Sequence, residues 1–368
     1  MRLFFLLFAV LFSFTTLTAQ QQDTTAVQKD KKERSYNLAA YPVLFYLPET
    51  RLGFGAAGIT TFRFKGESES SRPSQVRLIA AYTLNKQILF YLPYELYWQE
   101  ENWLARGEVG YYRYFYDFYG IGNDQPTDYK EQFEVRFPRV RFNLQRLVAP
   151  NLYTGVRYWF DNYNVTSVEE GGQLASDAIT GGGNGGIVSG LGWLSAYDSR
   201  DNIFYPTKGF FIETLAFFNK KALGSDFNFN RYTLDAVSYI GLPWKDHVIA
   251  TNLYTGFITG DAPFNELMLV GGWRRARGYY EGRYRDNSMA LVQAEYRFPL
   301  PWRFGAVVFG SLGQVADNYA ELPSAPMRWN VGGGIRFMLN EEDRVNIRLD
   351  VGVGKETLGY YLTIGEAF

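Results

Sequence analysis

Cysteine is absent from this 368-residue chain, and histidine occurs only once, as His247. Without cysteine the chain has no disulfide, and it offers no thiolate to a metal site or to a nucleophilic mechanism. A serine hydrolase needs a histidine base beside its serine, and His247 closes a short turn, Leu242–His247, away from any obvious serine and acid. We therefore expect no enzymatic activity, no catalytic residues, no bound metal and no cofactor.

Long apolar runs and an excess of one charge are also missing from most of the chain. After residue 19, no segment approaches the ~18 consecutive apolar residues of a membrane-spanning helix. The formal net charge is -1, which argues against nucleic acid as a general partner.

The first 35 residues differ from the rest and divide into two segments. Arg2 precedes the apolar run Leu3–Phe14, and small or polar residues follow up to Ala19, so residues 1–19 are predicted to be a signal peptide. Residues 20–35 are polar and charged, which predicts a disordered periplasmic linker. Residues 36–368 are expected to form the folded domain.

Aromatic residues and glycine are abundant: the chain contains Tyr 28, Phe 30, Trp 8 and Gly 37. This composition favours a β-protein with many turns, and about sixteen segments read as strands. The predicted strands are 36–47, 51–65, 74–84, 86–98, 102–117, 130–147, 150–166, 184–198, 209–220, 226–241, 246–259, 287–299, 302–316, 327–339, 344–354 and 357–368.

Apolar and charged residues alternate along these segments. Between residues 344 and 354, for example, Val345, Ile347 and Leu349 lie on one face of a strand, whereas Arg348 and Asp350 lie on the other. Both faces are continuous from strand to strand, and the polar face is too densely charged for the surface of a soluble sandwich. The pattern predicts an all-β fold, a transmembrane antiparallel β-barrel of about sixteen strands with a charged lumen and an apolar outer belt.

The segment 130–147 breaks this alternation. Phe133 and Phe137 share one parity with Val135, but after Pro138 the apolar residues change parity. A β-bulge near Pro138 is predicted to return all the apolar residues to one face.

The connections alternate between short and long. With the N-terminus in the periplasm, the four longest connections follow odd-numbered strands, which is the asymmetry of barrels in the outer membrane of a Gram-negative bacterium. We therefore expect outer-membrane lipids and lipopolysaccharide to be partners of the outer surface.

The loop around Val270–Arg285, with the sequence VGGWRRARGYYEGRYR, is unlike the strands beside it. One reading is a solvated external loop whose basic residues contact lipopolysaccharide phosphates. The other is a loop that folds back into the lumen, where its guanidinium groups must be paired because they cannot lose their protons.

Two motifs carry a family resemblance. The segment Tyr197–Gly209 reads YDSRDNIFYPTKG, and Ala276–Tyr279 reads ARGY in the loop before the fifth strand from the end. Together they resemble the barrel domain of the BamA/TamA family of outer-membrane insertases and secretion translocators, also described as a bacterial surface antigen type C-terminal domain. The resemblance implies a motif at a periplasmic turn, carried here by Asp198, Arg200, Asp201, Pro206 and Gly209.

The resemblance also implies a latch inside the lumen. In this family the arginine of the loop, Arg277 here, meets acids on neighbouring strands, and Gly278 and Tyr279 complete the loop tip. Glu295 matches the first acidic position. The second acid is expected in Phe309–Gly313, where Ser311 stands in its place, so one partner of Arg277 is predicted to be missing.

The last predicted strand, Thr357–Phe368, ends in a pattern similar to the signal by which barrels are recognised for membrane insertion. Tyr360, Leu362, Ile364 and Phe368 share one parity and are expected on one face.

The resemblance implies assisted insertion or translocation of proteins or envelope components, acting on client proteins or with a separate periplasmic partner. Members usually carry periplasmic modules ahead of the barrel, and only residues 20–35 precede it here. The alternative is a passive channel or structural barrel without insertase activity, which the serine at position 311 and the missing modules favour.

Overall fold

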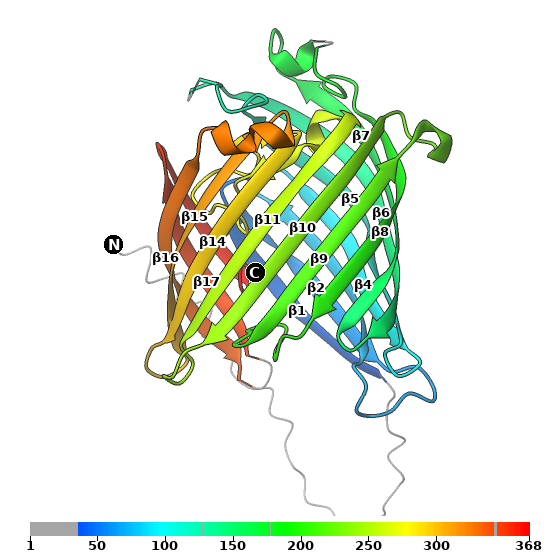
Figure 1. Ribbon diagram of the computed structural model, residues 1–368, viewed down its shortest axis with the longest axis vertical. Coiled ribbons are helices and arrows are strands. Elements are labelled where there is room, and N and C mark those ends of the chain that lie inside the picture. Colours follow the sequence, from blue (N-terminus) through cyan, green and yellow to red (C-terminus); the bar gives the residue numbers. More distant parts are fainter. Residues whose placement is uncertain (1–35, 127, 177, 342–343) are drawn as a thin grey trace, which may run out of the picture. The chain divides into compact units, whose positions relative to one another are not determined.

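The structure of the protein is a computed structural model that describes residues 36–126, 128–176, 178–341 and 344–368. The predicted signal peptide and linker, residues 1–35, lie outside this part of the chain. In the described residues, sixteen antiparallel strands close into one barrel (Figure 1). They are β1 (Tyr36–Leu47), β2 (Arg51–Phe62), β3 (Ser74–Thr83), β4 (Ile88–Trp98), β5 (Trp103–Phe118), β6 (Glu131–Ala149), β7 (Leu152–Val168), β8 (Gly186–Asp198), β9 (Gly209–Asn219), β10 (Asn228–Gly241), β11 (Val248–Asp261), β14 (Ser288–Pro299), β15 (Phe304–Ala316), β16 (Arg328–Asn340), β17 (Val345–Gly354) and β18 (Thr357–Ile364).

A second, two-stranded sheet interrupts the barrel sequence. It consists of β12 (Met268–Val270) and β13 (Tyr284–Asp286), so that β11 pairs directly with β14 in the barrel wall. Short 3-10 helices lie in the connections, at η1 (Gln173–Ala175), η2 (Lys221–Leu223), η3 (Phe264–Glu266) and η4 (Tyr319–Ser324). Among the described residues, no helix has the length and apolar character to cross a membrane.

The alternation of side chains places charge inside the barrel and apolar groups outside, as predicted. On β17, Leu349 is 49% exposed and Val353 is 42% exposed, whereas Arg348 and Asp350 are fully buried between them. The same pattern runs along β14, where Val292 points outward and Glu295 inward. Period two therefore assigns the faces of these two strands correctly, and the predicted fold class is confirmed.

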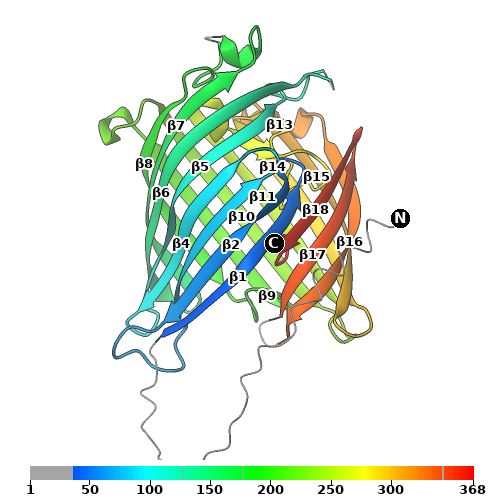
Figure 2. The same ribbon diagram turned by 180° about the vertical axis from the view of Figure 1, so that it is seen from behind.

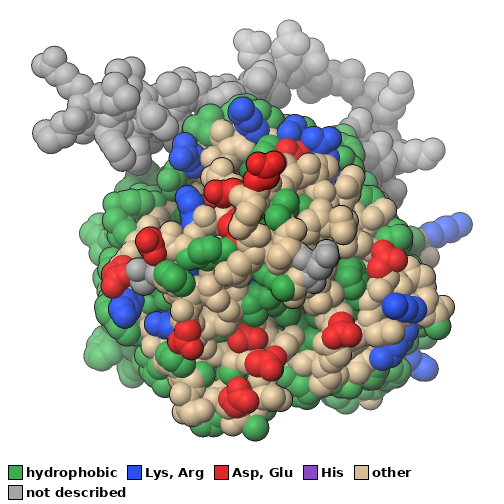
Figure 3. Space-filling model, turned by 90° about the horizontal axis from the view of Figure 1, so that it is seen from above, with side chains coloured by type: hydrophobic (Ala, Val, Ile, Leu, Met, Phe, Trp, Pro, Cys, Tyr) green, Lys and Arg blue, Asp and Glu red, His purple; other side chains and the backbone are tan. Residues whose placement is uncertain are grey.

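The two ends of the barrel differ. The connections 119–130, 169–185 and 262–287 lie at one end, here called the loop end, at the top of Figure 1. The other end, the turn end, carries short turns such as 150–151 but also the longer connections 63–73 and 199–208. Seen from the loop end, chain covers most of the barrel mouth, with acidic side chains scattered over it (Figure 3).

The predicted bulge near Pro138 is wrong. The register between β5 and β6 runs without a break from Tyr112↔Phe137 through Tyr111↔Pro138, and the irregularity falls instead between Glu134 and Val135, on the β7 side. The apolar residues before Pro138 therefore face the lumen, and those after it face outward.

The physical reason is that apolar side chains, and not water, fill the lumen near the loop end. Phe133 and Phe137 belong to a buried aromatic cluster inside the barrel, closed by the 262–287 connection. The ring of Phe264 lies 5.2 Å from that of Phe133 and 5.6 Å from that of Phe118, measured between centroids. Burial of these rings outweighs the general preference for a polar lumen, since a buried aromatic ring removes a large apolar area from water.

The outward positions beside Phe133–Phe137 are correspondingly polar. Glu134 forms ion pairs with Arg113 and Arg136, both at 2.8 Å, on the outer face of β5 and β6. The sequence pattern assigned Glu134 and Arg136 to the lumen, so this stretch of β6 is inverted relative to the prediction.

Candidate functional site: a loop held inside the barrel

The loop 271–283, which joins β12 to β13, lies inside the barrel and is called the lumen loop below. Its flanks are apolar, because Val270, Ala276 and Tyr284 are buried in the aromatic cluster. Its glycines allow the sharp reversals that the tip requires, with φ of +120° at Gly271 and +117° at Gly278. Of the two readings of this segment, the structure therefore places the loop inside the barrel rather than in solvent.

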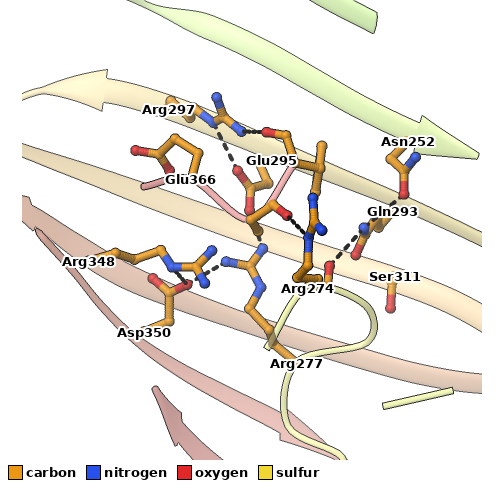
Figure 4. Close-up of polar contacts among 12 residues, drawn as sticks. Asn252, Arg274, Arg277, Gln293, Glu295, Arg297, Ser311, Arg348, Asp350 and Glu366 are labelled. Carbon is orange, nitrogen blue, oxygen red and sulfur yellow. Dashed lines mark hydrogen bonds and ion pairs between the residues drawn. The ribbon is translucent and has the colours of Figure 1, made fainter. Parts of the chain in front are cut away.

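Arg277 at the tip is almost completely buried, with 1% of its side chain exposed. Its guanidinium contacts the carboxylate of Glu295 on β14 through Nη2 and that of Asp350 on β17 through Nη1 (Figure 4). The guanidinium carbon also lies 3.6 Å from the ring centroid of Phe309 on β15. One cation thus joins the loop to three strands, in a fork geometry that suits two carboxylates.

The sequence analysis did not find Asp350 as a partner of Arg277. Asp350 on β17 takes the place of the acid that is absent at position 311. The sequence pattern showed that Asp350 faces the lumen, but it did not show that Asp350 lies next to the loop. Ser311 instead hydrogen-bonds Asn330 on β16, and Asn330 Nδ2 donates to the carbonyl oxygen of Arg277 at 2.6 Å. Ser311 therefore acts on the loop only through Asn330.

Three further arginines surround the same carboxylates. Arg297 Nε binds Glu295 at 2.9 Å, Arg336 Nη1 binds Asp350 at 2.5 Å, and Arg348 Nε lies 3.5 Å from Asp350. All are nearly or fully buried. We call this group, together with Arg277 and Glu366, the latch network; its members are Arg277, Glu295, Arg297, Arg336, Arg348, Asp350 and Glu366. The four arginines already outnumber the three carboxylates, so removing one of the carboxylates leaves buried cations uncompensated, which is costly in a site of low dielectric constant.

The backbone next to Arg277 approaches the barrel wall closely. A Cβ atom on Gly278 would lie 2.8 Å from the carbonyl carbon of Gly352 on β17, so both positions need glycine. The Gly278 N–H donates to the hydroxyl of Tyr361 at 2.8 Å, and Thr357 Oγ1 donates to the Gly278 carbonyl at 2.7 Å. Tyr279 in turn donates its hydroxyl to the carbonyl of Trp329 at 2.9 Å. The loop tip is therefore fastened to β16, β17 and β18.

At its other side the lumen loop meets the turn between β1 and β2. The Glu281 N–H donates to Glu49 Oε1 at 2.7 Å; the side chain of Glu49 is buried and that of Glu281 is partly buried. Burial, followed by the charge of Glu281, raises the pKa of Glu49 to about 8. Two carboxyl groups thus meet here without an arginine between them, unlike the contacts around Arg277.

A family model described as the Omp85 superfamily domain matches residues 26–368. The chain belongs to the Omp85 superfamily. No curated protein matches it.

Solved Omp85-type barrels have the same fold. The chain is similar to BamA from Haemophilus ducreyi lacking POTRA domains 1-3, with a TM-score of 0.61 and 15% identity over 90% of this chain and 70% of that one. It is also similar to CdiB from Acinetobacter baumannii, with a TM-score of 0.59, 12% identity and coverage of 90% and 60%. For CdiB from Escherichia coli the TM-score is 0.57, the identity 9% and the coverage 93% and 64%. The chain thus spans less than two thirds of either CdiB chain, and at these identities the likeness shows the fold alone.

Superfamily membership and the apolar outer belt together make this chain an Omp85-type outer-membrane barrel. The motif Tyr197–Gly209 lies at the turn end of this Omp85 barrel, from the last two residues of β8 to the first residue of β9. Arg200 binds both carboxylate oxygens of Asp198 at 2.8 Å, and Asp201 accepts the backbone N–H groups of Thr207 and Lys208. Burial opposes ionisation of Asp201, but the hydrogen bonds from Thr207 and Lys208 outweigh it and lower its pKa.

Proline and glycine complete this turn. Pro206 is buried, and Gly209 has a φ of +102° with the carbonyl of Ser199 against the position of a Cβ. All five residues of the motif thus shape the turn, and among the described residues none of the five forms an ion pair with the latch network.

The end of the chain departs from the prediction. Tyr360 and Ile364 on β18 are exposed on the outer face, but the strand ends at Ile364, and Gly365 with a φ of +85° turns the chain inward. Phe368 therefore does not share a face with Tyr360; it packs inside the barrel beside Val237 and Tyr239.

Segment 366–368 is bound by the latch network. Glu366 accepts from Arg336 Nε at 2.9 Å and from Asn346 Nδ2 at 3.0 Å. The carbonyl of Phe368 accepts from Arg297 Nη2 at 2.9 Å. Nothing in the alternating pattern signalled this inward turn except Gly365.

The junction between β1 and β18 is the weakest in the barrel wall. β1 pairs with β2 along its whole length, from Tyr36↔Phe62 to Leu47↔Arg51. With β18, the one register pair among the described residues is Tyr46↔Leu362. Figure 2 shows these two strands side by side, in blue and red. We call this junction the seam.

His247 lies in an aromatic setting. Its Nδ1 is 2.6 Å from the hydroxyl of Tyr296, its ring stacks near Phe298, and the ring of Trp244 lies tilted beside it. Among the described residues, no group of histidine, aspartate and glutamate side chains is arranged to hold a metal ion.

Proposed function

We propose that this Omp85 barrel inserts proteins or envelope components into the outer membrane, or translocates them across it, by opening the seam. The observation that carries the proposal is the single register pair Tyr46↔Leu362 between β1 and β18. Every missing pair leaves backbone N–H and C=O groups at a strand edge, and such groups bind an added strand.

The composition of β1 supports this role. Pro42 has no N–H and removes one donor from a strand that would otherwise pair along its length. The seam is also the place where the barrel can open without breaking a fully paired ladder, because both of its strands are held firmly on their other sides, by β2 and β17.

The lumen loop supports the proposal because it is fastened to β18. Tyr361 and Thr357 bind the backbone of Gly278, so the loop holds β18 from inside while Arg277 holds β17. We propose that release of the loop tip would free β18 to move relative to β1. Client proteins, and a separate periplasmic partner that delivers them, are the partners this mechanism requires.

A disulfide across the seam tests the proposal. The chain contains no cysteine, so Tyr46→Cys with Leu362→Cys creates one reactive pair. The purified double variant is placed in liposomes with an unfolded outer-membrane barrel as client, and insertion is measured by protease protection. We expect oxidation to reduce insertion at least tenfold and a reductant to restore it.

A matched control uses the same position on β18. Leu349→Cys with Leu362→Cys joins β17 to β18, which are already fully paired neighbours. Oxidation of this pair is expected to leave insertion unchanged. Equal insertion by the oxidised seam variant and the wild type would reject the mechanism.

A conductance measurement distinguishes the proposed function from the alternative of a passive channel or structural barrel. The lumen loop and segment 366–368 fill part of the interior, which disfavours a permanently open pore. A steady conductance of the wild type in a planar bilayer, combined with no insertion activity, would favour the passive barrel.

A further inference from the structure

The apolar outer belt stops below the loop end on the wall formed by β2 to β6, which lies in front in Figure 2, in blue and cyan. Outward residues of this belt are large, apolar and well exposed, among them Phe54, Leu84, Tyr111 and Phe142. Polar lipid headgroups begin where such a belt stops. The side chains just beyond the belt therefore show which chemistry the protein offers to the lipid headgroups.

The charged side chains just beyond the belt on this wall are cationic. Arg51 lies at the turn between β1 and β2, Lys86 lies in the turn between β3 and β4, and both are exposed. Arg113 on β5 follows Tyr111 by two residues on the same outer face, and its register partner on β6 is Arg136. We call Arg51, Lys86, Arg113 and Arg136 the basic stripe.

The basic stripe follows neighbouring strands without a gap. The Leu84 N–H donates to the carbonyl of Leu52 at 2.9 Å, which joins the two turns at the loop ends of β1 to β4. Ile88, the first residue of β4, pairs with Arg113 on β5. The four cations therefore lie along one continuous part of the outer rim.

The two arginines of β5 and β6 share one carboxylate. Arg113 and Arg136 each bind Glu134 at 2.8 Å, and their side chains remain 30% and 42% exposed. The next acid on this face, Asp117, pairs with Lys130 at 3.4 Å. One positive charge of the arginine pair is therefore not compensated by the wall, and both guanidinium groups can still be reached from outside.

The other two cations have no acidic partner. Within the described residues, neither Arg51 nor Lys86 takes part in an ion pair, and both are exposed. The acid nearest to Arg51 in the chain, Glu49, is buried and accepts the N–H of Glu281 from the lumen loop. The basic stripe thus sets four cations against the single carboxylate of Glu134.

The wall on the other side of the barrel offers the opposite charge at the loop end. There β11 ends in the exposed Asp261, and the connection between β15 and β16 carries the exposed Asp317 and Glu321. This connection packs over the outer face of β11, where the hydroxyls of Tyr319 and Thr255 are 3.1 Å apart. An excess of cations is therefore a property of the β2 to β6 wall and not of the whole rim.

We propose that the basic stripe binds the phosphate groups of lipids in the outer leaflet of the outer membrane. Guanidinium forks bind phosphate oxygens in a bidentate way, and a basic residue beside an anionic lipid surface adds attraction of its own. Acyl chains of the same lipid would pack against Leu84 and Tyr111 of the belt, directly below the stripe. This combination of belt and cations fits a phosphorylated lipid better than a soluble anion.

The test titrates the full chain, purified in detergent, with diphosphoryl lipid A, and native mass spectrometry measures the fraction of protein that carries the lipid. We expect saturable binding that is weaker for monophosphoryl lipid A and weaker at high salt. Arg51→Gln with Lys86→Gln is the most informative variant, because it breaks no ion pair of the described structure. Since each basic residue contributes about fivefold, this variant should weaken binding at least tenfold.

A second variant removes the shared carboxylate together with its arginines. Arg113→Gln, Glu134→Gln and Arg136→Gln in one chain lower the charge of the stripe by one and leave no acid unpaired, so binding should weaken about fivefold. Lys65→Gln with Arg303→Gln is the matched control, because it removes one lysine and one arginine that are exposed at the turn end. Its affinity should equal that of the wild type.

Each variant must migrate faster unboiled than boiled on a gel, which shows a closed barrel. If a multiple variant fails this check, Lys86→Gln alone takes its place, with an expected loss of about fivefold. Equal affinities of the stripe variants and the turn-end control would overturn the proposal. So would equal binding of diphosphoryl and monophosphoryl lipid A, or complete displacement of lipid A by inorganic phosphate, which would assign the stripe to a free oxyanion.

Discussion

Two walls of the same lumen use arginine in different ways. On β14 to β17 the latch network packs Arg277 against Glu295 and Asp350 with almost no exposed surface. On β6 to β11 the arginines surround a cavity, and their partners are more exposed: in the pair of Arg275 with Asp235, the side chains are 33% and 27% exposed.

Unpaired guanidinium nitrogens occur on both walls, for example Nε of Arg277 and Nε of Arg231. The two walls differ in whether side chains fill the volume beside the arginines. Where side chains fill the volume, the cations can only bind the carboxylates and carbonyls already present, and they act as structural ties. Where a cavity remains, the paired side chains keep more exposed surface, as Arg275 and Asp235 do. The comparison shows that arginine content alone does not distinguish a buried latch from a set of partly exposed ion pairs.

The largest expected effect comes from a substitution in the latch network on β14 to β17, called the closed wall below. Asp350→Ala leaves Arg277, Arg336 and Arg348 around an empty position, and we expect a loss of about 3–5 kcal/mol in the free energy of unfolding. Asp235→Ala removes a partly exposed acid from the other wall and should cost less than about 1 kcal/mol. Denaturant unfolding in detergent measures both. Equal losses would show that the two walls do not differ in the way described.

The second effect concerns coupling within the closed wall. Arg277→Ala and Glu295→Ala each strand a buried partner, so the double variant should be less destabilised than the sum of the singles by about 1–3 kcal/mol. Protease cleavage of the lumen loop on intact cells should rise in the Arg277→Ala variant. Additive losses together with unchanged cleavage would mean that this pair does not hold the loop.

A smaller, pH-dependent effect is expected where the loop meets the first hairpin. Because burial raises the pKa of Glu49 to about 8, its contribution to stability is complete below about pH 4.5 and is lost as the pH rises towards 8. Glu49→Gln keeps an oxygen for the Glu281 N–H and should raise stability at pH 8 by on the order of 1 kcal/mol, with little change at pH 5. The negative charges of Glu281 and Asp117 also raise the pKa of Glu49. Asp117→Asn removes one of these charges and is therefore a useful comparison. A wild type whose stability does not vary between pH 5 and 8 would contradict the assignment.

The smallest effect should come from the cavity wall. Arg275→Gln removes one of several like charges around the cavity, and its loss of stability should stay below about 1 kcal/mol because its ion pair is partly exposed. A loss as large as that of Asp350→Ala would mean that this wall is also closed.

Much of the fold was predictable because strand periodicity is local. The alternation that ends in Leu349 and Asp350 assigns faces without knowledge of any neighbour. The prediction was wrong at Phe133–Phe137, where Phe264, far along the chain, supplies an apolar partner inside the barrel. It was also wrong at Phe368, because Gly365 turns the segment towards Arg336 and Arg297 rather than extending β18.

The candidate site was predictable in part for the same reason. Arg277 and Glu295 could be paired from motif and parity, whereas Asp350 was visible only as one of many inward-facing acids. The cavity beside Arg274 had no signal in the sequence, because an empty volume is a property of how distant strands pack and not of any one segment.

The sequence by itself determined that this chain is a barrel with a charged interior and an apolar exterior, since that follows from period-two alternation and the absence of helical spans. Only the tertiary structure decided which interior charges meet. A barrel brings residues as distant as Arg277 and Asp350 to within 2.5 Å, and it leaves space beside others, because closure of the sheet and the path of the lumen loop fix these distances together.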